Sequence, residues 1–132
     1  MEVTALDLVS YLKRKELLQL NEVSSLTEQL AQAVSRRDQV SVNLLLSMRQ
    51  EPILQLQELR ETLHTRLESF PEDEAIRISA LLDGAPAESA KEEALAKQVA
   101  QCRRVLERVV AMDRQISERM GGKKSFYLKY RL

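Results

Sequence analysis

The chain has 132 residues, with 20 Lys+Arg and 20 Asp+Glu, so its formal net charge is zero. Hydrophobic residues make up 44% and aromatic residues 4%, with three glycines and three prolines, a composition typical of long helices and unlike that of β-sheet folds. One Cys and one His exclude an internal disulfide and the usual Cys/His zinc site, and zero net charge argues against electrostatic binding to nucleic acid.

The first predicted helix covers residues 4–37, a stretch without Gly or Pro. Thr4 and Asp7 have the spacing of a capping box at its start. Apolar residues then recur at steps of three or four, with one gap at Glu16, which is the period of one helix face. This predicted stripe consists of Val9, Leu12, Leu20, Val23, Leu26, Leu30 and Val34.

A corner is predicted at residues 36–38, because two arginines suit a helix end and Asp38 suits the next helix start. The second helix then covers residues 38–69, with a kink expected near Pro52, since proline removes a backbone hydrogen bond. Its predicted stripe is Leu45, Met48, Leu56, Leu59, Leu63, Leu67 and Phe70.

The first half of this helix is apolar on more than one side. Val42, Leu46 and Ile53 lie beyond the stripe, and a contact between two helices needs a narrower one. This stretch is therefore either wedged between two other helices or partly exposed for a partner.

Pro71 can start a short third helix with an apolar face of Ile76, Leu81 and Leu82, which residues 83–86 stop. Ser89 and Glu92 have capping-box spacing at the start of the last long helix, and Gly121-Gly122 ends it. The predicted stripe of that helix is Leu95, Val99, Cys102, Leu106, Val109, Met112, Ile116 and Met120.

Together these elements predict an all-α fold, an antiparallel, coiled-coil-like bundle of three long helices plus one short helix. We expect a single bundle domain at 1–122 and a basic, aromatic tail at 123–132. The competing architecture is an extended two-helix hairpin that forms a homodimer.

No catalytic, metal or cofactor site is expected. His64 lies off the apolar stripe, and its neighbour Glu61 has the Glu-x-x-His spacing of di-iron bundles, which need a second such motif. Cys102 lies within a stripe and should behave as a small core residue. With no phosphate-binding loop or nucleophile elbow either, the protein is predicted not to be an enzyme.

No run of 18 apolar residues is present, and the first residues lack the basic start and apolar core of a signal peptide. We therefore expect a cytoplasmic protein without membrane contact. Arg103, Arg104 and Arg108, together with the tail, leave a small nucleic-acid-binding regulator as a minor alternative.

Several segments, in this order, resemble one protein family. They are Leu17-Leu18-Gln19-Leu20 through Leu26–Leu30, then Arg37-Asp38 and Leu44–Gln50, and near the end Met112-Asp113-Arg114-Gln115 and 122–127. This order of features resembles the flagellar type III export chaperones of the hook-junction-protein class.

The resemblance implies a cytoplasmic chaperone without nucleotide that holds the apolar helix of an export client in a helix-in-groove contact. Two groups of residues are predicted to bind the partner: Val42, Leu46 and Ile53 in the second helix, and Phe126, Tyr127 and Tyr130 in the tail. The alternative is a structural coiled-coil or scaffold protein that self-associates.

Overall fold

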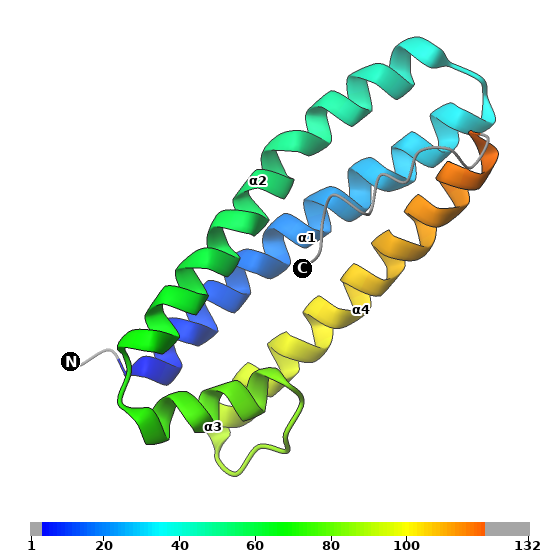
Figure 1. The fold of residues 1–132 in the computed structure, drawn as a ribbon. Coiled ribbons are helices and arrows are strands. Elements are labelled where there is room, and N and C mark those ends of the chain that lie inside the picture. Colours follow the sequence, from blue (N-terminus) through cyan, green and yellow to red (C-terminus); the bar gives the residue numbers. More distant parts are fainter. Residues whose placement is uncertain (1–3, 121–132) are drawn as a thin grey trace.

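The computed structural model describes residues 4–120 and confirms the all-α prediction: these residues form four helices and no strand. The helices are α1 (Ala5–Ser35), α2 (Gln39–Ser69), α3 (Glu72–Leu82) and α4 (Ala90–Arg119). Figure 1 shows the three long helices lying side by side, with α1 between α2 and α4. Helix α3 crosses the end of the bundle where α1 begins and leads the chain from α2 to α4.

The predicted start of α1 and the corner after it are confirmed. The hydroxyl of Thr4 accepts from the Asp7 backbone N–H (3.1 Å), and the Asp7 carboxylate accepts from the Thr4 N–H (3.2 Å). At the corner, Asp38 caps α2 by accepting from the Ser41 N–H (3.1 Å). Arg37 reverses the chain with a φ of 57°, a conformation that L-residues other than Asn and Asp seldom adopt.

Helix α2 continues through Pro52 as one helix, and Pro52 is buried within it. The predicted capping box at the start of α4 is only half present. Ser89 accepts from the Glu92 N–H (3.2 Å), but the Glu92 carboxylate accepts from the N–H of Glu88 and pairs with Arg77 of α3 (2.6 Å). Glu92 therefore connects the first turn of α4 both to α3 and to the loop that precedes α4.

The core consists of three clusters of buried apolar side chains along the bundle. The middle cluster joins all three long helices through Leu20, Val23, Ile53, Leu56, Cys102, Val105 and Val109. The cluster near the α1–α2 corner contains Leu26, Leu30, Ala33, Val42, Leu45 and Ile116. The cluster at the opposite end contains Val9, Ile78, Leu81, Leu95 and Val99, with Leu63, Leu67 and Phe70 packed against it.

Three stripe predictions are wrong. Met48 is 48% exposed, Ile76 63% and Met120 39%, so none of them is a core residue. Ile78 and Val105 are buried, although the predicted stripes omitted them. In α3, helix steps of three and four from the buried Leu81 lead to Ile78, and Ile76 falls on the opposite side. The Gly121-Gly122 helix stop and the 123–132 tail lie outside the described residues.

Candidate functional site

The structure does not expose the predicted partner-binding residues of α2. Val42 and Ile53 each keep 3% of their surface, and Leu46 is half-buried against the cluster that contains Ile116 of α4. They face inward because the core clusters that contain them join α2 to both α1 and α4. The buried apolar stripe of α2 is therefore broader than packing against a single helix would require. The stretch is not wedged between two helices, because α1 lies between α2 and α4 (Figure 1): one side of it packs into the core, and its other apolar side chains are exposed. The tail residues Phe126, Tyr127 and Tyr130 lie outside the described residues.

A different set of apolar side chains in α2 is open to solvent. Val40 is 80% exposed, Leu44 59%, Leu54 51% and Met48 48%. Val40, Leu44 and Leu54 belong to a series with alternating steps of four and three, which is the spacing of a coiled-coil seam. We call this series the outer seam; it consists of Val40, Leu44, Ser47, Glu51, Leu54 and Glu58, all exposed, with Met48 at its edge.

The outer seam lies opposite the buried face of α2, which includes Leu45, Arg49 and Leu56. It extends over residues 40–58, or about 27 Å at a rise of 1.5 Å per residue. Its length matches five turns of a second helix. Exposed apolar side chains that recur with helix periodicity on one face mark an interaction surface more often than scattered ones do.

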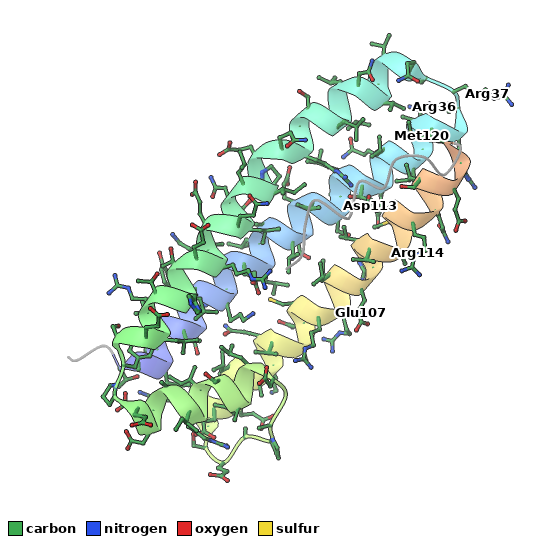
Figure 2. All side chains as sticks on the ribbon, viewed as in Figure 1. Arg36, Arg37, Glu107, Asp113, Arg114 and Met120 are labelled. Atoms are coloured by element: carbon green, nitrogen blue, oxygen red, sulfur yellow. The ribbon has the colours of Figure 1, made fainter. Side chains whose placement is uncertain are left out.

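Charges of opposite sign lie at the two ends of the outer seam. The corner before α2 exposes Arg36 and Arg37, which Figure 2 shows at the tip of the bundle. Arg36 lies 3.7 Å from Asp38. The other end of the seam carries Glu58, and Glu61 follows one step later on the same face. Along the sequence, positive charges therefore precede the seam and negative charges lie at its end.

Directly behind the outer seam, an ion pair crosses the core. Arg49 of α2 donates from Nη1 to Asp113 Oδ1 of α4 (2.6 Å) and to Thr27 Oγ1 of α1 (2.8 Å). The Thr27 hydroxyl in turn donates to the Val23 carbonyl (2.6 Å). Arg49 keeps 1% of its surface and Asp113 none, so water does not screen this pair.

Asp113 lies on the side of α4 that faces α1, whereas Glu107 and Arg114 are exposed (Figure 2). Burial raises the pKa of the Asp113 carboxyl above its ordinary value, and the hydrogen bond from Arg49 acts in the opposite direction. Asp113 Oδ2 and Ser117 Oγ, one helical turn apart, have no hydrogen-bond partner among the described residues. The pair fixes α2 and α4 at one height against α1 and so fixes the direction in which the outer seam faces.

Sequence reasoning did not find this pair, although both residues carry the resemblance to the export chaperones. A signal was present. Arg49 lies four residues after Leu45, and Asp113 lies four after Val109 and three before Ile116. Both therefore occupy core positions of their helices, and a charge at a core position needs a partner of opposite sign.

The residues weighed as catalytic candidates form no reactive arrangement. His64 is exposed and lies 3.1 Å from Glu68, one helical turn away. Cys102 is buried, with its Sγ 3.7 Å from the Lys13 carbonyl oxygen. Burial, with a smaller contribution from Glu16, raises the pKa of its thiol to about 12, so Cys102 remains a thiol at neutral pH. No cluster of metal-ligating side chains occurs within residues 4–120.

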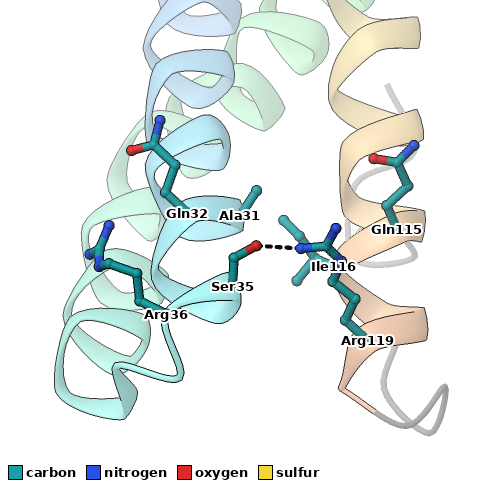
Figure 3. A pocket seen from close by; sticks show the side chains of 7 residues that line it. All are labelled: Ala31, Gln32, Ser35, Arg36, Gln115, Ile116 and Arg119. Atoms are coloured by element: carbon teal, nitrogen blue, oxygen red, sulfur yellow. Dashed lines mark hydrogen bonds between the residues drawn. The ribbon is translucent and has the colours of Figure 1, made fainter.

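A shallow hollow of about 470 Å³ lies between the last turns of α1 and α4. In Figure 3, Arg119 bonds across it to Ser35, and Gln32, Arg36 and Gln115 surround it. Both helices end here, and cations are favoured at helix C-termini. Their positions at the C-terminal ends of α1 and α4 therefore account for Arg36 and Arg119 without a bound ligand.

The structure places the three arginines considered for nucleic-acid binding in different environments. Arg103 donates to the Leu82 carbonyl (3.1 Å) and so joins α4 to the end of α3. Arg104 and Arg108 are exposed, with the carboxylate residue Glu107 between them in sequence.

Comparison with known proteins gives no relative: no family model, curated protein or solved structure matches this chain. Within the described helices, none is both long and apolar enough to span a membrane.

Proposed function

We propose that this protein is a non-enzymatic binding module that holds an apolar helix of a client protein, as a cytoplasmic chaperone of flagellar or other type III export does. The observation that carries the proposal is the outer seam of α2, where Val40, Leu44 and Leu54 expose half or more of their surface on one helix face.

The spacing of the seam favours a helix as the occupant. Steps of four and three align side chains along a second helix that crosses α2 at a small angle. An amphipathic client helix would cover the exposed leucines with its apolar face. The buried face of α2 is held by core packing and by the Arg49–Asp113 pair, so α2 provides a rigid platform.

The resemblance to export chaperones is compatible with this surface. One of the segments that carry it, Leu44–Gln50, includes Leu44 on the seam, Met48 at its edge and Arg49 behind it. The same segment therefore contributes both to the proposed docking face and to the ion pair that supports it.

The proposal is tested by capture from a lysate of the native host with three matched variants. We expect Leu44→Glu and Leu54→Glu to lose a specific helical client that the wild-type chain captures. Leu18→Glu is the control, because Leu18 is a 67% exposed leucine of α1 outside the seam. Equal capture by all variants, or equal loss with Leu18→Glu, would contradict the proposal.

A truncation after Gly122 tests the tail residues Phe126, Tyr127 and Tyr130 separately. If they contribute to binding, the truncated chain captures less client while the seam variants still differ from Leu18→Glu. If capture is unchanged, the outer seam acts without the tail.

A further inference from the structure

We infer that, when no client is bound, the outer seam of α2 pairs with the outer seam of a second copy of this chain, running antiparallel. This inference rests on the proposed function, since it names an occupant of the same docking face. Its basis is that the seam is complementary to itself in one orientation.

The order of residues along the seam defines the pairing. The six positions are symmetric about residue 49, so an antiparallel copy places Leu44 against Leu54 of the second copy, and Leu54 against its Leu44. These two layers bury four leucines that are otherwise 51–59% exposed. A two-fold axis through the middle of the seam relates the two copies.

The two central polar positions, Ser47 and Glu51, also match in this register. Ser47 comes to lie against Glu51 of the second copy, where its hydroxyl can donate to the carboxylate, and the symmetry repeats the contact. In the described structure, Glu51 accepts from Gln55 of its own helix (3.1 Å), and a carboxylate can accept further hydrogen bonds. The two polar residues at the centre of the seam therefore each face a polar residue of the second copy.

The charged ends of the seam decide the orientation. Antiparallel pairing brings the exposed Arg37 of one copy near Glu58 and Glu61 of the other. Parallel pairing would place Glu51 against Glu51, Glu58 against Glu58 and Arg37 against Arg37. Opposed like charges cost free energy, so the parallel arrangement is disfavoured.

A second copy fits the middle of this face, because Leu44 and Ser47 find counterparts in Leu54 and Glu51, and the charged ends attract each other; at the ends of the seam, Val40 lies beside Glu58. The zero net charge of the chain also removes the long-range repulsion that would keep copies apart. Client and second copy cover the same leucines and therefore compete. Self-pairing protects the seam until a client displaces it.

The test is disulfide crosslinking between two variants that each add one cysteine, Leu44→Cys and Leu54→Cys, made in the full chain. In the antiparallel dimer, two residues at position 44 are ten residues apart along the pair, or about 15 Å, too far for a disulfide. Residue 44 of one copy, however, faces residue 54 of the other. We therefore expect crosslinking in an equal mixture of the two variants and little in either variant alone.

The native Cys102 need not be replaced, because it is buried in the bundle. Leu18→Cys mixed with Leu54→Cys is the matched control and should not crosslink. Crosslinking of Leu44→Cys by itself would indicate a parallel pair and overturn the inference. So would the absence of crosslinks together with a monomeric mass by sedimentation at 100-micromolar concentration.

Failure of the pairing is distinguishable from failure of the docking face. A monomeric protein that captures a client, and loses it with Leu44→Glu but not with Leu18→Glu, would refute the dimer alone. Reversal of charge provides a second readout: Arg37→Glu should weaken the dimer, and adding Glu58→Arg and Glu61→Arg should restore it. No restoration would contradict the assigned register.

Discussion

Replacing Arg49 with methionine tests how the bundle holds its three long helices. Methionine is of comparable length and keeps the apolar contacts of the stem, but it removes the cation that faces Asp113 and Thr27. Asp113 has no exposed surface, and its hydrogen bond among the described residues comes from Arg49. A carboxylate left in the core in this way costs about 3–5 kcal/mol of unfolding free energy at pH 7.

The penalty should depend on pH in a defined direction. Without Arg49, burial raises the native pKa of Asp113 further above its ordinary value of 3.8, so the native state binds a proton that the unfolded chain has lost. The penalty therefore grows as pH rises through the range between the unfolded and the native pKa, and it shrinks toward pH 4. The wild type and Arg49→Met should differ less in stability at pH 4 than at pH 7.

Chemical denaturation followed by circular dichroism at both pH values measures these differences. The double variant Arg49→Met with Asp113→Leu is the control, because it removes both charges and should be at least as stable as the wild type, by up to about 4 kcal/mol. If Arg49→Met lowers the free energy of unfolding by less than about 1 kcal/mol at both pH values, the pair does not anchor the core.

Four other outcomes follow from the same structure. Thr27→Val removes the hydroxyl that accepts from Arg49 and should lower the unfolding free energy by about 1–3 kcal/mol, measured by denaturation. Ile53→Ala should cost about 2–5 kcal/mol because it opens the core, whereas Leu44→Ala should stay within about 0.5 kcal/mol in the same assay. Cys102 should stay unlabelled by a thiol reagent in the native state at both pH 7 and pH 9 and react on unfolding, because its thiol is buried and its raised pKa keeps it protonated, which mass spectrometry can follow. Gly84→Ala should lower the melting temperature, because Gly84 has a φ of 104° and a Cβ there would lie 3.3 Å from Arg103 Nη1.

The helix pattern was readable from the sequence because it depends on local chemistry. Thr4, Asp38 and Ser89 each cap the helix that their position predicts, and steps of three and four placed Leu20, Leu56 and Val109 in the core. These signals need only the spacing along one helix.

The exposed face of α2 was not readable in the same way. Val42 and Leu44 are both apolar residues near the start of α2, and only the positions of α1 and α4 decide that the first is buried and the second exposed. The sequence therefore indicated an excess of apolar surface but assigned it to the wrong residues. Arg49 and Asp113 were missed because the core positions were searched for apolar residues alone.

The central claim, that the outer seam of α2 is the docking face, is tested most directly by methyl NMR on the full chain. Valine, leucine and methionine methyl signals would be followed on dilution of the protein and on addition of a captured client helix. The account predicts shifts concentrated at Val40, Leu44, Met48 and Leu54, with little change at Leu18, which is 67% exposed. Shifts centred on Leu18, or none on α2 in either titration, would contradict it.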